Sequence, residues 1–112
     1  MGCLTICKRG GATCVVLMLA GELDVQSAAA LRIALVEAVE ARARAVTVDV
    51  SHLRLCDSVG ISALIFGYQR AGLHGITFAV INPRGEVATV LAATGLKDLL
   101  GPHEATSPPG YD

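Results

Sequence analysis

Two kinds of apolar segment alternate along this chain, and the alternation limits the folds that it can adopt. Short runs rich in Val, Leu and Ile, at Thr13–Ala20, Val46–Val50 and Ile76–Ile81, have the composition of strands. The segments that follow them repeat apolar residues at helical spacing. Strands that alternate with helices form βαβ units with right-handed crossovers, so we predict parallel strands in an α/β domain.

A hairpin precedes the first of these units. Cys3–Cys7 predicts a strand, Lys8–Ala12 contains two glycines typical of a turn, and Thr13–Ala20 predicts the returning strand. We therefore expect a mixed, mostly parallel sheet of four to five strands that opens with the hairpin. Its helices are expected to form a layer on one face.

Three helices are predicted after the strands. They run from Asp24 or Ser27, either of which is a suitable N-cap, to about Ala43, from Asp57-Ser58 to about Gly72, and from Gly85 to Thr94. Gly95 is expected to end the third helix as its C′ residue. Ser51–Cys56 is predicted to be the loop that leads into the second helix.

The length and charge of the chain exclude several classes of protein. With 112 residues and a formal net charge of -1, we expect one domain at residues 1–100, without the basic surface that nucleic acid requires. The longest apolar run, Cys14–Ala20, is far shorter than the roughly 20 residues that span a bilayer, so we predict a cytoplasmic protein without membrane insertion. Residues 101–112 are predicted to be a flexible tail rich in Pro and Gly.

The four cysteines leave packing, a metal site and redox chemistry open. Cys3 and Cys7 share one face of a predicted strand about 13 Å apart, too far to bridge or to bind one ion. Cys7 and Cys14 can face each other across the hairpin, but the cytosol would keep both reduced. We favour simple packing and expect neither a metal nor a cofactor.

Catalytic motifs are absent from the sequence. It contains no nucleophile elbow, no P-loop, no dinucleotide-binding fingerprint and no histidine pair at metal-binding spacing. A serine hydrolase built on Ser58 would need a nearby general base, which no histidine is placed to supply. We therefore predict a protein that acts by binding other proteins, and not an enzyme.

The segment Leu55–Ile61 at the second strand-to-helix junction is the strongest candidate site. Asp57 or Ser58 can cap the helix that follows, which is the simpler interpretation of this pair. Ser58 in the first turn is expected to point away from the apolar stripe, with Gly60 leaving the backbone open beside it. A phosphate on Ser58 would meet the positive end of the helix dipole, so this serine is a candidate phosphorylation site.

Taken together, these motifs resemble the STAS domain of bacterial anti-sigma factor antagonists. The resemblance extends from about Val15 to Leu100 and rests on Gly21-Glu22-Leu23-Asp24, Ser27-Ala28, Leu31-Arg32, Asp49 after a Val-rich run, Asp57-Ser58-Val59-Gly60-Ile61 and Thr94-Gly95-Leu96. It implies a STAS-like single domain whose serine, Ser58, is phosphorylated by an anti-sigma factor with serine kinase activity. A phosphatase would then remove the phosphate.

The resemblance also implies a partner-binding surface around Ser58. Its expected members are Asp24, Asp57, Ser58, Gly60, Ser62 and Phe66. Ser62 and Phe66 follow Ser58 at i+4 and i+8 and so share its helical face. In its unmodified form this surface would bind the anti-sigma factor and free a sigma factor, and a phosphate on Ser58 would disrupt that contact.

Other interpretations stay open at this point. Asp24 and Asp57 are also explained as helix caps alone. Val59 stands where the family more often has a small hydroxyl residue. The main alternative within the same fold is a STAS subunit of an ABC-type phospholipid transporter, in which phosphorylation is not required. The sequence is also compatible with a homodimer, and it identifies neither the sigma factor nor the upstream signal.

Overall fold

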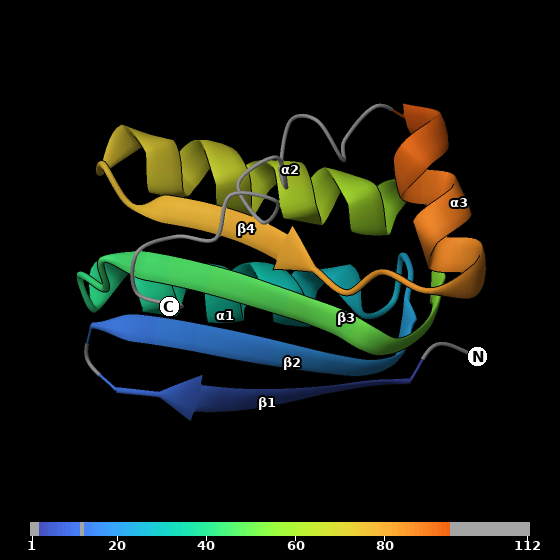
Figure 1. Ribbon diagram of the computed structural model, residues 1–112, viewed down its shortest axis with the longest axis horizontal. Coiled ribbons are helices and arrows are strands. Elements are labelled where there is room, and N and C mark those ends of the chain that lie inside the picture. Colours follow the sequence, from blue (N-terminus) through green and yellow to red (C-terminus); the bar gives the residue numbers. More distant parts are fainter. Residues whose placement is uncertain (1–2, 12, 95–112) are drawn as a thin grey trace.

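In the computed structural model, which describes residues 3–11 and 13–94, a four-stranded sheet carries two helices on one face (Figure 1). The strands, adjacent in chain order, are β1 (Leu4–Gly10), β2 (Cys14–Leu23), β3 (Ala45–Cys56) and β4 (Thr77–Ile81). The helices are α1 (Ala28–Glu40), α2 (Ser58–Leu73) and α3 (Gly85–Thr94). β1 and β2 are antiparallel and the other pairs are parallel, which confirms the predicted mixed sheet with its opening hairpin.

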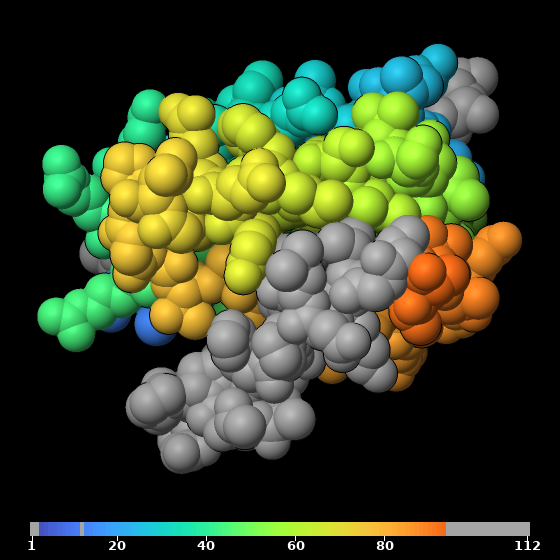
Figure 2. Space-filling view, turned by 90° about the horizontal axis from the view of Figure 1, so that it is seen from above, coloured from blue at the N-terminus to red at the C-terminus, as the bar shows by residue number. Residues whose placement is uncertain are grey.

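The hydrophobic core lies between the sheet and the layer formed by α1 and α2. Side chains alternate along a strand, so every second residue of β2 and β3 faces this layer. These inward residues, all at most 2% exposed, are Val15, Leu17, Leu19, Val46, Val48 and Val50. Leu31 and Leu35 of α1 and Leu64 of α2 pack against them. Figure 2 shows α2 running along the molecule with α1 beside it.

The prediction of a loop at Ser51–Cys56 is wrong, because β3 continues to Cys56. The neighbouring strand β2 is also longer than expected and reaches Leu23. Glu22 pairs with Leu55 and Leu23 pairs with Cys56 in the parallel ladder. This pairing stabilises the extension because it provides hydrogen-bond partners for backbone N–H and C=O groups. The polar residues Ser51 and His52 interrupt the β-branched run, so the sequence alone does not indicate this continuation.

The hairpin also differs in register from the expectation. β1 includes Lys8 and Arg9, and Cys7 lies opposite Met18. Met18 is four strand residues beyond Cys14, a separation of about 13 Å, so the prediction that Cys7 faces Cys14 is wrong. A disulfide requires Cα atoms within roughly 7 Å, so this register rules one out between these two residues.

The helix boundaries are close to those predicted. α3 matches Gly85–Thr94 and packs against β3 at the carboxyl end of the sheet (Figure 1). α1 ends at Glu40 and not at Ala43, and Arg42 just beyond it has a φ of 63°. Gly95 and the proposed tail at residues 101–112 lie outside the described residues.

Candidate functional site

β2 and β3 end side by side and place two aspartates at the same edge of the sheet. Leu23 pairs with Cys56 in the parallel ladder. The residue that follows each strand is an aspartate, Asp24 after β2 and Asp57 after β3. The Asp57 N–H donates to the carbonyl oxygen of Leu23 at 3.1 Å, which joins the start of α2 to the end of β2. Ligands of open α/β sheets commonly bind at this carboxyl edge.

Asp57, one of the two caps that the sequence allows, is the N-cap of α2. Its backbone is extended, with φ of -95° and ψ of -174°, and its Oδ1 accepts a hydrogen bond from the Gly60 N–H at 2.9 Å. The carbonyl oxygen of Asp57 accepts the first helical bond, from Ile61. The cap therefore satisfies one of the N–H groups that the first turn of a helix leaves unpaired.

Gly60 is buried, and its surroundings differ from those expected. A β-carbon on Gly60 would lie 2.7 Å from Cγ of Leu23 and 2.8 Å from the Leu23 carbonyl oxygen. Leu23 thus fills the space that the sequence suggested was open. Gly60 allows α2 to contact the end of β2, and this contact holds the first turn in place.

Ser58 is the first residue of α2, and its side chain is exposed. Within residues 3–11 and 13–94, no hydrogen bond engages its hydroxyl, whereas its carbonyl oxygen accepts a bond from Ser62 Oγ at 3.0 Å. The next residue, Val59, is half-buried and packs against the core. The helix therefore anchors Val59 inward and presents the Ser58 hydroxyl to solvent.

Asp24 shapes the loop between β2 and α1. Its Oδ1 accepts hydrogen bonds from the N–H groups of Gln26 and Ser27, at 3.0 and 3.2 Å. Ser27 occupies the N-cap position of α1, but its side chain does not cap the helix and instead donates to the Glu22 carbonyl oxygen at 2.9 Å. Both candidate caps of α1 therefore stabilise the loop before the helix.

Two arginines lie over the ring of Phe66, an arrangement that sequence reasoning missed. The guanidinium carbon of Arg32 on α1 is 5.5 Å from the centre of the ring, and that of Arg70 on α2 is 5.7 Å from it. The i,i+4 spacing of Phe66 and Arg70 indicates the second contact. The first depends on how α1 packs against α2.

Cys56 precedes the N-cap and is buried, unlike Cys3, Cys7 and Cys14. Burial, together with the negative charge of Asp57, raises the pKa of its thiol to about 11. Such a thiol stays protonated and unreactive near neutral pH.

Within residues 3–11 and 13–94, no group of three His, Cys, Asp or Glu side chains has an arrangement that could hold a metal ion. None of the three helices described there is long and apolar enough to cross a bilayer.

A family model described as Mlab, STAS domain matches residues 8–101. A search of curated protein sequences finds no match. The crystal structure of an anti-sigma factor antagonist from Mycobacterium paratuberculosis superposes with a TM-score of 0.78 at 27% identity, over 89% of this chain and 86% of that chain.

Two further relatives share the fold at lower identity. The unphosphorylated form of the anti-sigma factor antagonist SpoIIAA gives a TM-score of 0.76 at 20% identity, over 91% of this chain and 93% of that one. The phosphorylated form of SpoIIAA from Bacillus gives a TM-score of 0.68 at 19% identity, over 91% of this chain and 96% of that chain. A sulfate transporter family protein from Wolinella succinogenes gives a TM-score of 0.68 at 16% identity, over 79% of this chain and 71% of that chain.

Proposed function

Because this chain belongs to the STAS domain family, we propose that it is an anti-sigma factor antagonist controlled by phosphorylation of Ser58. Unmodified, it binds an anti-sigma factor of the serine kinase type, and that binding frees a sigma factor. The kinase phosphorylates Ser58 and ends the interaction, and a phosphatase restores it. The likeness to a Mycobacterium anti-sigma factor antagonist and to SpoIIAA, described in phosphorylated and unphosphorylated forms, supports this proposal.

The observation that carries the proposal is the position of the Ser58 hydroxyl. It is exposed and has no hydrogen-bond partner in the described part of the chain, so a kinase can reach it without unfolding the helix. The positive end of the helix dipole lowers the cost of placing a phosphate there.

The switch needs only a change of charge. A phosphate adds about -1.5 to -2 charges beside Asp57, and a partner surface shaped for a neutral hydroxyl offers no cation to balance them. Burying an unbalanced charge of this size costs several kcal/mol, and each 1.4 kcal/mol or so is tenfold in affinity. The loop and cap hydrogen bonds of Asp24 and Asp57 do not involve the Ser58 hydroxyl, so its modification does not require the fold to change.

The proposed docking surface extends from Ser58 along one face of α2. Ser62 is exposed one turn later, and Phe66 is half-buried two turns later, about 12 Å from Ser58 along the helix axis. The two arginines that contact Phe66 give this part of the surface a positive charge, in contrast to Asp24 and Asp57 at the other end. A fitting partner presents acidic groups near Phe66 and hydrogen-bond donors near Ser58.

Mass spectrometry of the protein purified from its native cells tests the modification. We expect a phosphate on Ser58 in the wild type, none on that peptide in Ser58→Ala, and an unchanged signal in the control Ser62→Ala. A phosphate confined to another residue in the wild type would contradict the proposal.

Binding to the kinase that co-purifies with the wild type tests the switch. We expect Ser58→Glu to weaken this interaction about a hundredfold, equivalent to about 2.7 kcal/mol, and Ser62→Glu to weaken it far less. Equal losses for both variants would indicate a general charge effect and not a switch at Ser58.

A transporter-associated role is the second candidate, since the fold also occurs in a sulfate transporter family protein. In that case the chain would serve as a STAS subunit of a transporter such as the ABC-type phospholipid class. It would then co-purify with a membrane complex, and Ser58→Ala would leave that association intact.

A further inference from the structure

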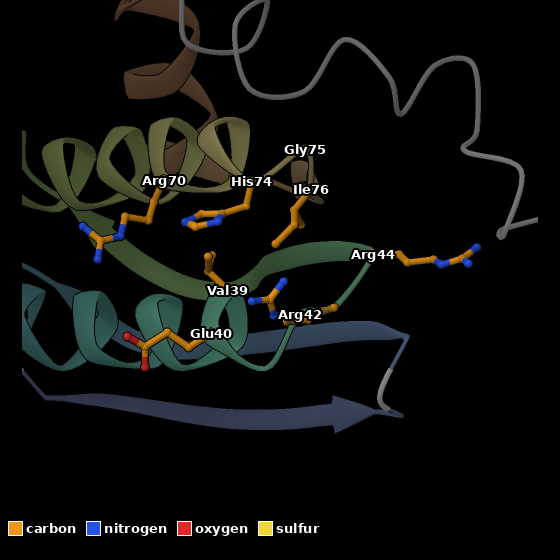
Figure 3. Close-up of a pocket in the computed structure, with 9 residues that line it drawn as sticks. Val39, Glu40, Arg42, Arg44, Arg70, His74, Gly75 and Ile76 are labelled. Carbon is orange, nitrogen blue, oxygen red and sulfur yellow. The ribbon is translucent and has the colours of Figure 1, made fainter.

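The end of α2 that lies opposite to Ser58 borders a pocket. A pocket of about 470 Å³ opens where α1 and α2 end, within the volume range typical of small-molecule sites (Figure 3). α2 has 16 residues and so spans about 24 Å. The pocket is therefore distant from Ser58, although Arg70, one of its lining residues, also contacts Phe66 of the proposed docking surface.

The pocket has an apolar floor and a basic rim. Val39, Ala43 and Ile76 line it and are at most 9% exposed. Three arginines and His74 also line it, against one acidic residue, Glu40. No ion pair in residues 3–11 and 13–94 involves these arginines, since the one ion pair found there joins Arg54 to Glu22. The rim therefore carries positive charge that the protein does not neutralise.

The arginines of the rim are not equivalent. In Figure 3, Arg42 and His74 project between the two helix ends, whereas Arg44 extends away from them. Arg70 lies at the outer edge, where it also contacts Phe66. Arg42 and His74, with Arg70 at the edge, are the groups placed to meet a ligand.

The backbone of Arg42 gives an independent indication. Arg42 has a φ of 63°, a left-handed conformation that costs a residue with a β-carbon about 1–2 kcal/mol. Gly75, which follows α2 on the other side of the same pocket, has a φ of 70° and pays no such cost. A cation in the last turn of a helix would complement the helix dipole equally well without this strain, as Arg70 does. The dipole alone therefore does not explain why arginine, and not glycine, stands at position 42.

We propose that this pocket binds a small organic phosphate. The guanidinium of Arg42 binds the phosphate through charge-assisted hydrogen bonds, with His74 and Arg70 beside it, and the organic part of the ligand packs on Val39, Ala43 and Ile76. Ser58, Asp24 and Asp57 take no part in this binding, and Arg70 is shared with the Phe66 end of the proposed docking surface.

Titration of the isotope-labelled full chain with phenyl phosphate tests the proposal, with amide chemical shifts of Arg42, Gly75 and Ile76 as the readout. We expect saturable shifts below about 10 mM, which corresponds to a Kd of about 1 mM or lower, and weaker binding of inorganic phosphate or phenol alone. The absence of saturable shifts at these residues would overturn the proposal.

Two variants distinguish a built site from general positive charge. Arg42→Gly should weaken phenyl phosphate binding at least about tenfold while its melting temperature stays equal or rises, because glycine adopts the positive φ without strain. Arg44→Gln, the matched control, should bind within about twofold of the wild type. Unchanged binding by Arg42→Gly, or an equal loss in Arg44→Gln, would contradict a role for Arg42 in a specific site.

Discussion

The two ends of α2 differ in both packing and charge. At the first end, Gly60 contacts Leu23, Asp57 caps the helix, and Asp24 follows the neighbouring strand β2. At the second end, the chain leaves a pocket of about 470 Å³, and the charged side chains around it are mostly arginine. One helix thus has a closely packed end beside two aspartates and an open end where the charged side chains are mostly arginine.

This difference corresponds to the two kinds of site proposed for this small domain. A docking surface needs a rigid framework, so that adding one phosphate changes the charge of the surface without changing its shape. The packed end supplies that framework. A ligand pocket instead needs unfilled volume and unpaired charge, which the open end supplies. Substitutions should therefore cost much more stability at the packed end than at the open end.

Replacing glycine at each end should produce the largest contrast. Gly60→Ala places a methyl group within 3.0 Å of both the side chain and the backbone of Leu23, so we expect a loss of about 2–3 kcal/mol in the free energy of unfolding. Gly72→Ala, in the same helix, meets nothing within 4 Å and should gain about 0.5–1 kcal/mol from helix propensity. Urea unfolding measures both, and a gain for Gly60→Ala would show that Leu23 moves aside easily.

Alkaline pH should weaken the packed end through Cys56. The folded chain raises the pKa of this thiol from its usual value of 9.0 to about 11, so the unfolded state binds fewer protons than the folded state in that window. The contribution of Cys56 to the free energy of unfolding is fully present below pH 9.0, the pKa of the unfolded state. It should fall by about 1–2 kcal/mol as the pH rises through the pKa of the folded state.

Urea unfolding at pH 8 and about pH 10.5 measures this loss. Cys56→Ala should lack this component of the pH dependence, and Cys14→Ala, which removes an exposed thiol, should retain it. A pH dependence unchanged in Cys56→Ala would assign the loss to other groups.

Removing the cap should have a smaller effect, confined to one end. Asp57→Ala loses the hydrogen bond from the Gly60 N–H, and we expect a cost of about 1 kcal/mol in the free energy of unfolding. Asp57→Asn retains an acceptor and should cost less. At the other end, the C-cap His74 uses its backbone N–H, so His74→Ala should stay within about 0.5 kcal/mol of the wild type. Similar losses for Asp57→Ala and His74→Ala in thermal or urea unfolding would remove the contrast.

Sequence reasoning predicted the local features of the candidate site well. The strand-to-helix junction, the capping by Asp57 and the exposure of Ser58 follow from residue types within one helical turn. It failed where a feature depended on a distant segment. The extension of β3 depends on pairing with β2, the close contact of Gly60 depends on Leu23, and the position of Arg32 over Phe66 depends on the packing of α1 against α2.

Local sequence patterns predict the order of strands and helices, the opening hairpin and the hydroxyl at the start of α2, because periodicity, caps and turns depend on near neighbours. The register of the strands, the closeness of α2 to β2 and the pocket between the two helix ends follow from the folded arrangement of the chain. These features arise from contacts between residues far apart in the chain, and local sequence patterns do not indicate which distant residues come into contact.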